Sequence, residues 1–172
     1  YTVIFNKRLK IGRNIMFFGS FIMRIHKNAF VSIGENSILL SDNFKSALPI
    51  KSVTKIICFY EGEVIIGKNV AISGSTISCR STSIRIGEGS LIAPNCVITD
   101  SNFHAKFPPE NRCYNLDLKS DKPIILNKNV WIGMNSIILK GAVIGENSII
   151  GAGSVVTGEV LPNSIYAGNP AI

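Results

Sequence analysis

The chain has 172 residues, 46% of them hydrophobic and only 17% charged, with a formal net charge of +7. This balance excludes a disordered tail, and no apolar run approaches the roughly 20 residues that a membrane-spanning helix requires. The positive charge attracts anions, but the basic residues are scattered and form no nucleic-acid-binding motif. A polyanionic small molecule or a surface polysaccharide therefore fits as well as nucleic acid. We expect a cytoplasmic protein of one domain, residues 1–172, with no nucleic-acid partner and no transmembrane segment.

A repeat with a period of six residues runs through the chain and is weakest in its N-terminal third. There it places only Ile11 and Ile33 in phase. The stretch from Leu40 to Tyr60 interrupts the repeat, which indicates either an excursion or an imperfect unit. We expect residues 1–63 to form irregular versions of the regular structure.

The repeat becomes clear over residues 64–98. Large aliphatic residues stand six positions apart within two runs, and the positions between them hold glycine or a smaller residue. The large residues are Ile66, Ile72, Ile86, Ile92 and Ile98, accompanied by Gly67, Val70, Gly87, Ser90, Ala93 and Cys96.

Between Ile98 and Leu126 the period disappears. This segment is polar and contains the adjacent Pro108 and Pro109. The change predicts a loop over about residues 99–125 that leaves the regular structure, and functional residues concentrate on such loops.

Residues 126–161 carry the strongest repeat. Six successive positions are aliphatic, an outcome on the order of one in a thousand by chance. They are Leu126, Ile132, Ile138, Ile144, Ile150 and Val156, with small residues at Ser136, Ala142, Ser148 and Ser154. Residues 162–172 follow as a C-terminal tail.

A six-residue period suits neither a helical stripe nor a long strand, but it suits a short strand that ends at a corner. Each strand points one large residue inward, and the corner accepts only a small residue or glycine. Three such sides form a triangular coil of about 18 residues, stacked at the strand spacing of about 4.8 Å. The sequence therefore predicts an all-β fold, a parallel β-helix.

The residues that precede the inward aliphatics are apolar as well, and alternation points them outward. They are Trp131, Ile137, Val143, Ile149 and Val155. Either they are scattered surface hydrophobes or they form a patch that packs against sister subunits, which we favour.

Four cysteines, Cys58, Cys79, Cys96 and Cys113, form no C-x-x-C pair, which argues against a zinc knuckle. The even spacing of the last three would bring them close together in a coiled structure. We expect buried free thiols, with disulfides as the alternative.

Three segments together resemble the hexapeptide-repeat acyltransferases. They are "IGEGSLIAPNCVI" (86–98), "TDSNFH" (99–104) and the stretch from "NVWIG" to "AGNPA" (129–171). The resemblance covers the chain from about Val64 onward. It is nearest to sugar O-acetyltransferases related to galactoside acetyltransferase and to enzymes that acetylate surface polysaccharides. It implies a left-handed β-helix, a homotrimer, and acetyl-CoA bound in the groove between neighbouring subunits.

Acetyl transfer to a hydroxyl needs a base for the proton and donors for the developing oxyanion. Of the two histidines, His26 lies in an ordinary N-terminal repeat and is expected to be structural, whereas His104 lies in the loop. The resemblance makes His104 the general base of a direct transfer and places the backbone N–H of Met134 at the oxyanion. An acyl-cysteine intermediate is the alternative, but no cysteine accompanies His104 in a nucleophile motif.

The resemblance also implies binding positions. For acetyl-CoA these are Trp131, Met134, Ala152 and Thr157; Trp131 could equally serve subunit packing, and the glycines around Ala152 could equally be corner residues. The chain ends at Ile172, where relatives often carry a basic residue for the CoA phosphate.

On the acceptor side the substrate-binding candidates are Ser73 and Asp100. Asp100 could orient the loop, and a solvated carboxylate is the alternative. Where galactoside acetyltransferase has acidic residues, this chain has Cys79 and Arg80. Arg80 could prefer an acidic or phosphate-linked sugar, but we favour a solvated Arg80.

The function expected is acetyl-CoA-dependent O-acetylation of a sugar hydroxyl, on a surface polysaccharide or its precursor. The alternatives are N-acetylation of a nucleotide-linked amino sugar, O-acetylation of serine, and a non-enzymatic β-helical scaffold. A carbonic-anhydrase-like zinc enzyme needs several histidine ligands, and two distant histidines argue against any metal.

Overall fold

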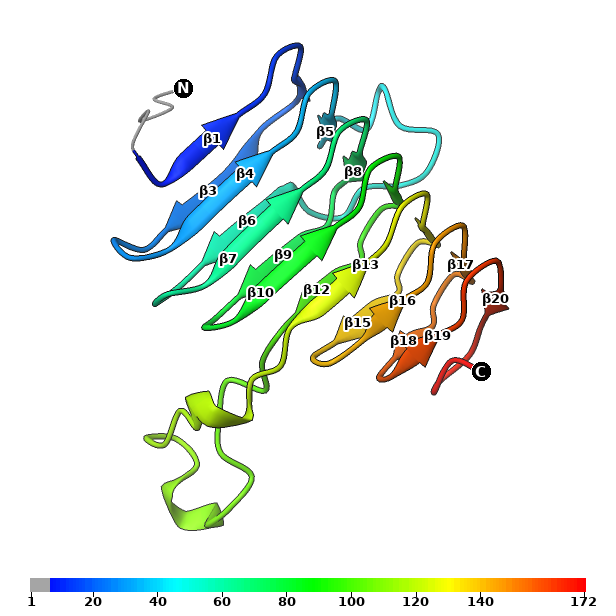
Figure 1. Cartoon of the computed structure of the whole chain (residues 1–172). Helices are drawn as coiled ribbons and strands as arrows, with labels where there is room; N and C mark the ends of the chain where they lie inside the picture. The colour runs from blue at the N-terminus through cyan, green and yellow to red at the C-terminus, as the bar shows by residue number, and fades with distance from the viewer. Residues whose placement is uncertain (1–6) are drawn as a thin grey trace.

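A computed structural model describes residues 7–172, so six residues of the expected 1–63 segment lie outside it. The described chain forms three parallel sheets of seven, seven and six strands, which are the three faces of a prism (Figure 1). The chain visits them in the repeating order sheet A, sheet B, sheet C and winds as a left-handed parallel β-helix. The predicted fold class is confirmed.

The strands are short, as the period predicts. Sheet A contains β1 (Leu9–Ile11), β4 (Phe30–Ile33), β7 (Glu63–Ile66), β10 (Ser83–Ile86), β13 (Ile124–Leu126), β16 (Val143–Ile144) and β19 (Glu159–Val160). Sheet B contains β2 (Met16–Phe18), β5 (Ile38–Leu40), β8 (Ala71–Ser73), β11 (Leu91–Ile92), β14 (Trp131–Ile132), β17 (Ile149–Ile150) and β20 (Ile165–Tyr166). Sheet C contains β3 (Phe21–Ile25), β6 (Thr54–Cys58), β9 (Thr76–Cys79), β12 (Val97–Thr99), β15 (Ile137–Leu139) and β18 (Val155–Val156).

The prism interior consists of aliphatic ladders. In sheet B, Ile72, Ile92, Ile132 and Ile150 stack in register from coil to coil, each no more than 2% exposed. The six aliphatic residues predicted between 126 and 156, and the small residues that accompany them, are all buried. Burying one such side chain contributes about 1.5–3 kcal/mol, so the ladders dominate the stability of the coils.

The corner between sheets A and B contains a column of left-handed residues. In all seven coils its third residue has a φ between 56° and 73°, namely Asn14, Asn36, Asn69, Gly89, Asn129, Asn147 and Asn163. Asparagine is among the few residues that tolerate this conformation. Carboxamides also bond along the column: Asn129 donates to Asn147 at 3.1 Å, and Asn147 donates to Asn163 at 2.9 Å.

The other two corners each carry an insertion (Figure 1). Residues 41–53 leave the corner between sheets B and C, so the interruption expected at 40–60 is an excursion followed by the regular strand β6. Residues 100–123 leave the corner between sheets C and A and project from the prism. This catalytic-loop candidate contains two 3₁₀ turns, η1 (Pro109–Asn111) and η2 (Leu118–Ser120), and is slightly shorter than the 99–125 expected.

The N-terminal coils pair in the same parallel register as the later ones. β1 pairs β4 and β4 pairs β7 without a shift. Their weaker sequence signal reflects large residues such as Phe17, Met23 and Ile25 that are only partly buried against the core.

The cysteines are free thiols, three of them buried and Cys113 exposed, so burial was wrongly expected for Cys113. The even spacing does not bring the last three together. Instead Cys58 and Cys79 are opposite one another on β6 and β9.

The five outward apolar residues do face outward, but they lie on three different faces and do not form one patch. The continuous apolar surface is on sheet B, where the first outward position of every strand is apolar. This sheet B row consists of Met16, Ile38, Ala71, Leu91, Trp131, Ile149 and Ile165. Within residues 7–172 no helix has the length and apolar character to cross a membrane.

Candidate functional site

Arg80 anchors the projecting loop. It follows β9 at the corner between sheets C and A and is 2% exposed. Its Nε and Nη2 donate to the two carboxylate oxygens of Asp121 at 2.8 and 2.7 Å, a bidentate pair at the C-terminal end of the loop. The solvated Arg80 favoured from sequence is therefore wrong, because the guanidinium is buried and paired.

The same guanidinium holds both arms of the loop. Nη1 donates to the carbonyl of Phe103 at 2.7 Å, and Nη2 donates to the carbonyl of Asp117 at 3.1 Å. Phe103 directly precedes His104 and has a φ of 65°, which is uncommon for an aromatic residue. Arg80 thus fixes the backbone from which the His104 side chain projects.

Asp100 holds the N-terminal end of the loop. Its fully buried carboxylate accepts hydrogen bonds from the backbone N–H of Arg80 at 2.6 Å and of Thr82 at 3.0 Å, and from the Thr82 hydroxyl at 2.9 Å. The solvated alternative for Asp100 is wrong. The enclosed carboxylate is engaged by the backbone of residues 80–82, which suits the loop-orienting interpretation, and its assignment to substrate binding stays a prediction.

The charge on Asp121 is stabilised by its partners. Burial by itself would raise the pKa of this carboxyl, but hydrogen bonds from Arg80, Ser81 and Ser101 outweigh burial and lower the pKa below its ordinary value. The carboxylate therefore stays ionised, and its pair with Arg80 persists, throughout the neutral range.

His104 is exposed on this anchored loop, and a single contact orients its ring. Its Nδ1 lies 3.0 Å from the carbonyl oxygen of Arg112, which can only accept a hydrogen bond. In the neutral imidazole the proton is then on Nδ1 and the lone pair is on Nε2. The backbone contact between Ala105 N–H and the carbonyl of Asn115, at 2.9 Å, joins the two arms beside it. His104 can therefore accept a proton through Nε2.

Met134 and Ala152 are neighbours at the corner between sheets B and C. The carbonyl of Met134 accepts a hydrogen bond from the N–H of Gly153 at 2.8 Å. Among the described residues, no group accepts from the backbone N–H of Met134 or Ala152. The second residue of other corners has the same free N–H, for example Glu35 and Lys128, so the coil geometry itself leaves this donor available.

The remaining candidates lie on other parts of the prism. Trp131 is half-exposed in the sheet B row, on β14, the strand that leads directly into the corner that holds Met134. Thr157 follows β18 at the corner between sheets C and A, and Ser73 ends β8 in sheet B. Within one chain the structure groups Trp131, Met134 and Ala152, and it places His104 at a different corner.

Cys79 is a poor nucleophile. Cys79 is 0% exposed, and its contact with Cys58, its burial and the nearby Asp100 all raise its pKa far above the ordinary value. A thiol that stays protonated cannot form an acyl intermediate at neutral pH. This geometry argues against the acyl-cysteine alternative for Cys79.

Sequence reasoning missed the pair of Arg80 with Asp121. The signal available was that aspartates stand at both ends of the aperiodic segment, Asp100 and Asp121, with an arginine at the same corner one coil earlier. Stacked coils bring residues from successive corners together, so this combination indicates a charged clamp.

Comparisons with known proteins agree with the fold. Residues 123–158 match the family model "Bacterial transferase hexapeptide (six repeats)", and residues 63–100 match "Hexapeptide repeat of succinyl-transferase". WbbJ of Escherichia coli, named for O-acetyl transfer in lipopolysaccharide biosynthesis, is 29% identical over 143 residues, which cover 80% of this chain and 70% of WbbJ. Galactoside O-acetyltransferase of Escherichia coli is 31% identical over 146 residues, which cover 84% of this chain and 63% of that enzyme.

Among solved structures, the chain resembles AntD, an N-acyltransferase from Bacillus cereus in complex with dTDP and 3-hydroxybutyryl-CoA. The TM-score is 0.68 at 24% identity, covering 94% of this chain and 79% of AntD. This likeness concerns the fold. The repeat matches, the curated relatives and the parallel prism agree with one another: the chain carries hexapeptide repeats and is similar to acetyltransferases.

Proposed function

We propose that the protein transfers an acetyl group from acetyl-CoA to a sugar hydroxyl, on a surface polysaccharide or its precursor. The observation that carries this proposal is the arrangement of His104, whose Nδ1 is engaged by the Arg112 carbonyl and whose Nε2 is available on a firmly anchored loop. The relatives named for O-acetyl transfer support the choice of a hydroxyl. Acetyl-CoA is a cytoplasmic metabolite, so the reaction is placed in the cytoplasm.

His104 acts as the general base in this proposal. Its Nε2 removes the proton of the acceptor hydroxyl while the oxygen attacks the acetyl carbonyl carbon. The free N–H of Met134 donates to the oxyanion that forms. When the intermediate collapses, the carbon–sulfur bond breaks, the ester remains on the sugar, and the proton held by His104 passes to the departing CoA thiolate.

The corner that holds Met134 and Ala152 has the chemistry to bind a pantetheine arm. Its free N–H groups match the amide carbonyls of such an arm, and Trp131 provides an apolar surface beside them. Apart from Gly153 itself and its two chain neighbours, no heavy atom of the described residues lies within 4 Å of the point where a Gly153 side chain would begin, so a ligand can approach the backbone there. Thr157 adds an exposed hydroxyl on the following corner.

A homotrimer would bring the separated groups together. In one chain His104 and Met134 are at different corners, so a complete site requires the loop of one protomer beside the corner of a neighbour. The continuous sheet B row supplies an apolar surface suited to such contacts, and it includes Leu91, Trp131 and Ile165, exposed by 48%, 50% and 72%.

N-acetylation of a nucleotide-linked amino sugar is the second candidate, and the fold shared with AntD favours it. An amine acceptor needs the same base and the same oxyanion donor. Parallel assays with hydroxyl and amine forms of one sugar decide between the two reactions.

The proposed role of His104 is tested with two substitutions. His104→Ala removes the base, and His104→Asn keeps a donor for the Arg112 carbonyl but lacks Nε2. We expect both variants to lose turnover by about a hundredfold or more, the scale of general-base catalysis, while light scattering shows an unchanged oligomer. Near-normal turnover in either variant would remove His104 from the chemistry.

A further inference from the structure

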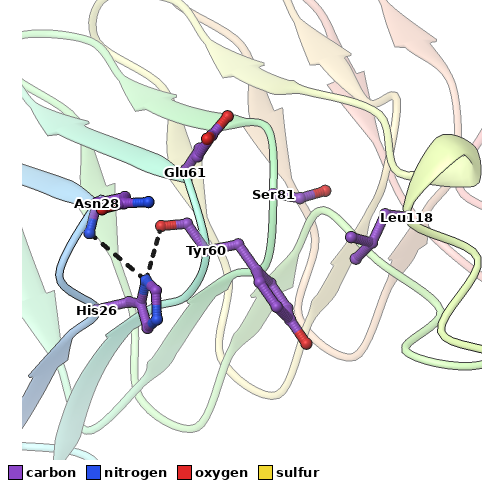
Figure 2. A pocket seen from close by; sticks show the side chains of 6 residues that line it. All are labelled: His26, Asn28, Tyr60, Glu61, Ser81 and Leu118. Atoms are coloured by element: carbon purple, nitrogen blue, oxygen red, sulfur yellow. Dashed lines mark hydrogen bonds between the residues drawn. The ribbon is translucent and has the colours of Figure 1, made fainter.

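A hollow lies at the edge of the prism between sheets C and A, from which the loop also projects. It has a volume of about 330 Å³ and is lined by His26, Asn28, Tyr60, Glu61, Ser81 and Leu118 (Figure 2). The first five residues come from successive corners between sheets C and A, and Leu118 comes from the loop. The volume is at the lower end of the range of about 300–1,000 Å³ typical of ligand sites.

Tyr60 occupies the middle of this hollow, with His26 and Asn28 on one side and Ser81 and Leu118 on the other (Figure 2). Its φ is 45°, a left-handed conformation that costs a bulky residue of order 1–3 kcal/mol. Asparagine or glycine at this position would avoid the cost, yet the chain has tyrosine there. The aromatic side chain at this corner is therefore unexplained by the needs of the coil.

His26 holds the strained backbone in place. Its Nδ1 lies 3.1 Å from the carbonyl oxygen of Tyr60, whereas the backbone nitrogen of Asn28, which would donate to an unprotonated Nδ1, lies farther away at 3.5 Å. The shorter contact places the proton on Nδ1, as for His104. Its Nε2 has no hydrogen-bond partner among the described residues, which leaves an acceptor available to a ligand hydroxyl.

The lining combines an aromatic ring with several hydroxyl-binding groups. Tyr60 is 38% exposed and offers part of its ring. Asn28 and Ser81 can donate or accept hydrogen bonds, and Glu61 accepts only. Sugars present an apolar C–H face and many hydroxyls, which suits an amphipathic ring flanked by such groups. The Glu61 carboxylate disfavours an acidic sugar, so a neutral unit fits best.

The hollow is joined to the catalytic loop through Arg80. Ser81 is adjacent to Arg80 in the chain, and Leu118 is adjacent to Asp117, whose carbonyl Arg80 binds. The same guanidinium binds the carbonyl of Phe103, next to His104. The hollow and His104 thus lie on segments that Arg80 holds together at one edge of the prism, as an acceptor with several sugar units would require.

We propose that the hollow is a subsite for a neutral sugar unit of the acceptor beyond the unit that is acetylated. This inference rests on the proposed function and makes it more specific: the acceptor is an oligosaccharide or polysaccharide, not a single sugar. The ring of Tyr60 stacks on the bound unit, and His26 serves as a positioning residue that holds Tyr60.

The test compares acceptor lengths. Acetyl transfer is measured with the methyl glycosides of galactose, glucose and mannose and with the corresponding neutral tetrasaccharides. We expect kcat/KM to be about tenfold higher for a tetrasaccharide than for its methyl glycoside, the scale of one aromatic contact with its hydrogen bonds. Tyr60→Asn tolerates the left-handed backbone and removes the ring, so it should abolish this length preference; Tyr60→Ala serves as a second variant.

Phe44→Ala is the matched control, because Phe44 is an exposed aromatic residue on the insertion at another corner. It should keep the length preference. A wild-type enzyme that treats both lengths alike, or a folded Tyr60→Asn variant that keeps the preference, overturns the inference while acetyl transfer itself stands. Absence of transfer to every sugar, short or long, would instead overturn the proposed function and the inference with it.

Discussion

The coils and the projecting loop are stabilised by opposite kinds of interaction. The coils depend on uncharged aliphatic ladders whose members repeat every coil, such as Ile92, Ile132 and Ile150. The loop depends on one buried guanidinium and two carboxylates, each present once. Removing one rung weakens a ladder that has many others. Removing one member of the clamp leaves a buried charge without its partner, so the effect is concentrated in the loop.

Arg80→Ala tests this difference most directly. It leaves Asp121 buried and unpaired, and breaking a buried ion pair costs about 3–5 kcal/mol. We expect the cost to appear as a loop that proteases cleave readily and as lost acetyl transfer, while circular dichroism still reports the coils. Arg85→Ala is the control, because Arg85 forms an exposed pair with Glu63 at 2.6 Å that is worth about 0–1 kcal/mol. Equal effects of the two substitutions would contradict the special role of the clamp.

Ile138→Ala probes the ladder. It creates a cavity in the interior and should lower the free energy of unfolding by about 2–5 kcal/mol, measured by urea denaturation. The loss should affect the whole prism, because stacked coils unfold with their neighbours. Ile137→Ala, on the adjacent outward residue that is 37% exposed, should cost much less. A small effect of Ile138→Ala would show that the ladders are not the main source of stability.

Asn147→Ala probes the column at the corner between sheets A and B. Alanine at a φ of 58° is strained, and the hydrogen bonds of the Asn147 carboxamide to Asn129 and Asn163 are lost. We therefore expect the free energy of unfolding, measured by urea denaturation, to fall by about 1–2 kcal/mol. Asn147→Gly removes the same bonds without the strain and should cost less. If glycine proves as damaging as alanine, the hydrogen bonds and not the backbone conformation explain this residue.

The smallest expected effect is that of low pH on the stability of the loop. The folded pKa of Asp121 is lowered, so its stabilisation of the loop is complete above the ordinary value of 3.8 and is lost as the pH falls below it. Hydrogen exchange of the amides near His104 should therefore accelerate below about pH 4, before the coils respond. Asp121→Asn should remove this pH dependence, whereas Glu159→Gln, on an exposed residue of sheet A, should keep it. If amide exchange near His104 accelerates at low pH in Asp121→Asn as it does in the unmodified protein, another group causes the acceleration.

The contrast between the periodic coils and the aperiodic loop also explains which features could be predicted from the sequence. The coils follow from spacing, because a residue such as Ile144 has the same environment as the residues one coil away. The position of His104 outside the coils also follows, since the period fails around it. Arg80 and Asp121 are 41 positions apart and belong to no period, and isolated arginines are usually exposed. No spacing rule could place them together in a buried pair.

The six-residue period also did not predict the sheet B row or the strained backbone of Tyr60. The six-residue phase shows that Trp131 points outward, but which face it shares with Leu91 and Ile165 depends on how coils of unequal length align. The insertions of 41–53 and 100–123 make the sequence spacing between coils unequal, so the period alone does not show which residues share a face. Backbone strain at Tyr60 has no signature in composition at all.

The column of left-handed asparagines makes one edge of the prism different from the other two. Every coil is joined to others there through the same compact corner, and none of the described coils carries an insertion at that edge. The other two edges already accommodate segments of thirteen and more residues without disturbing the strand register. Foreign peptides should therefore be grafted at residues 44–48, whereas an insertion between Glu146 and Asn147 should prevent the flanking coils from stacking. The prism therefore has one edge that excludes insertions and two edges that can carry new recognition segments.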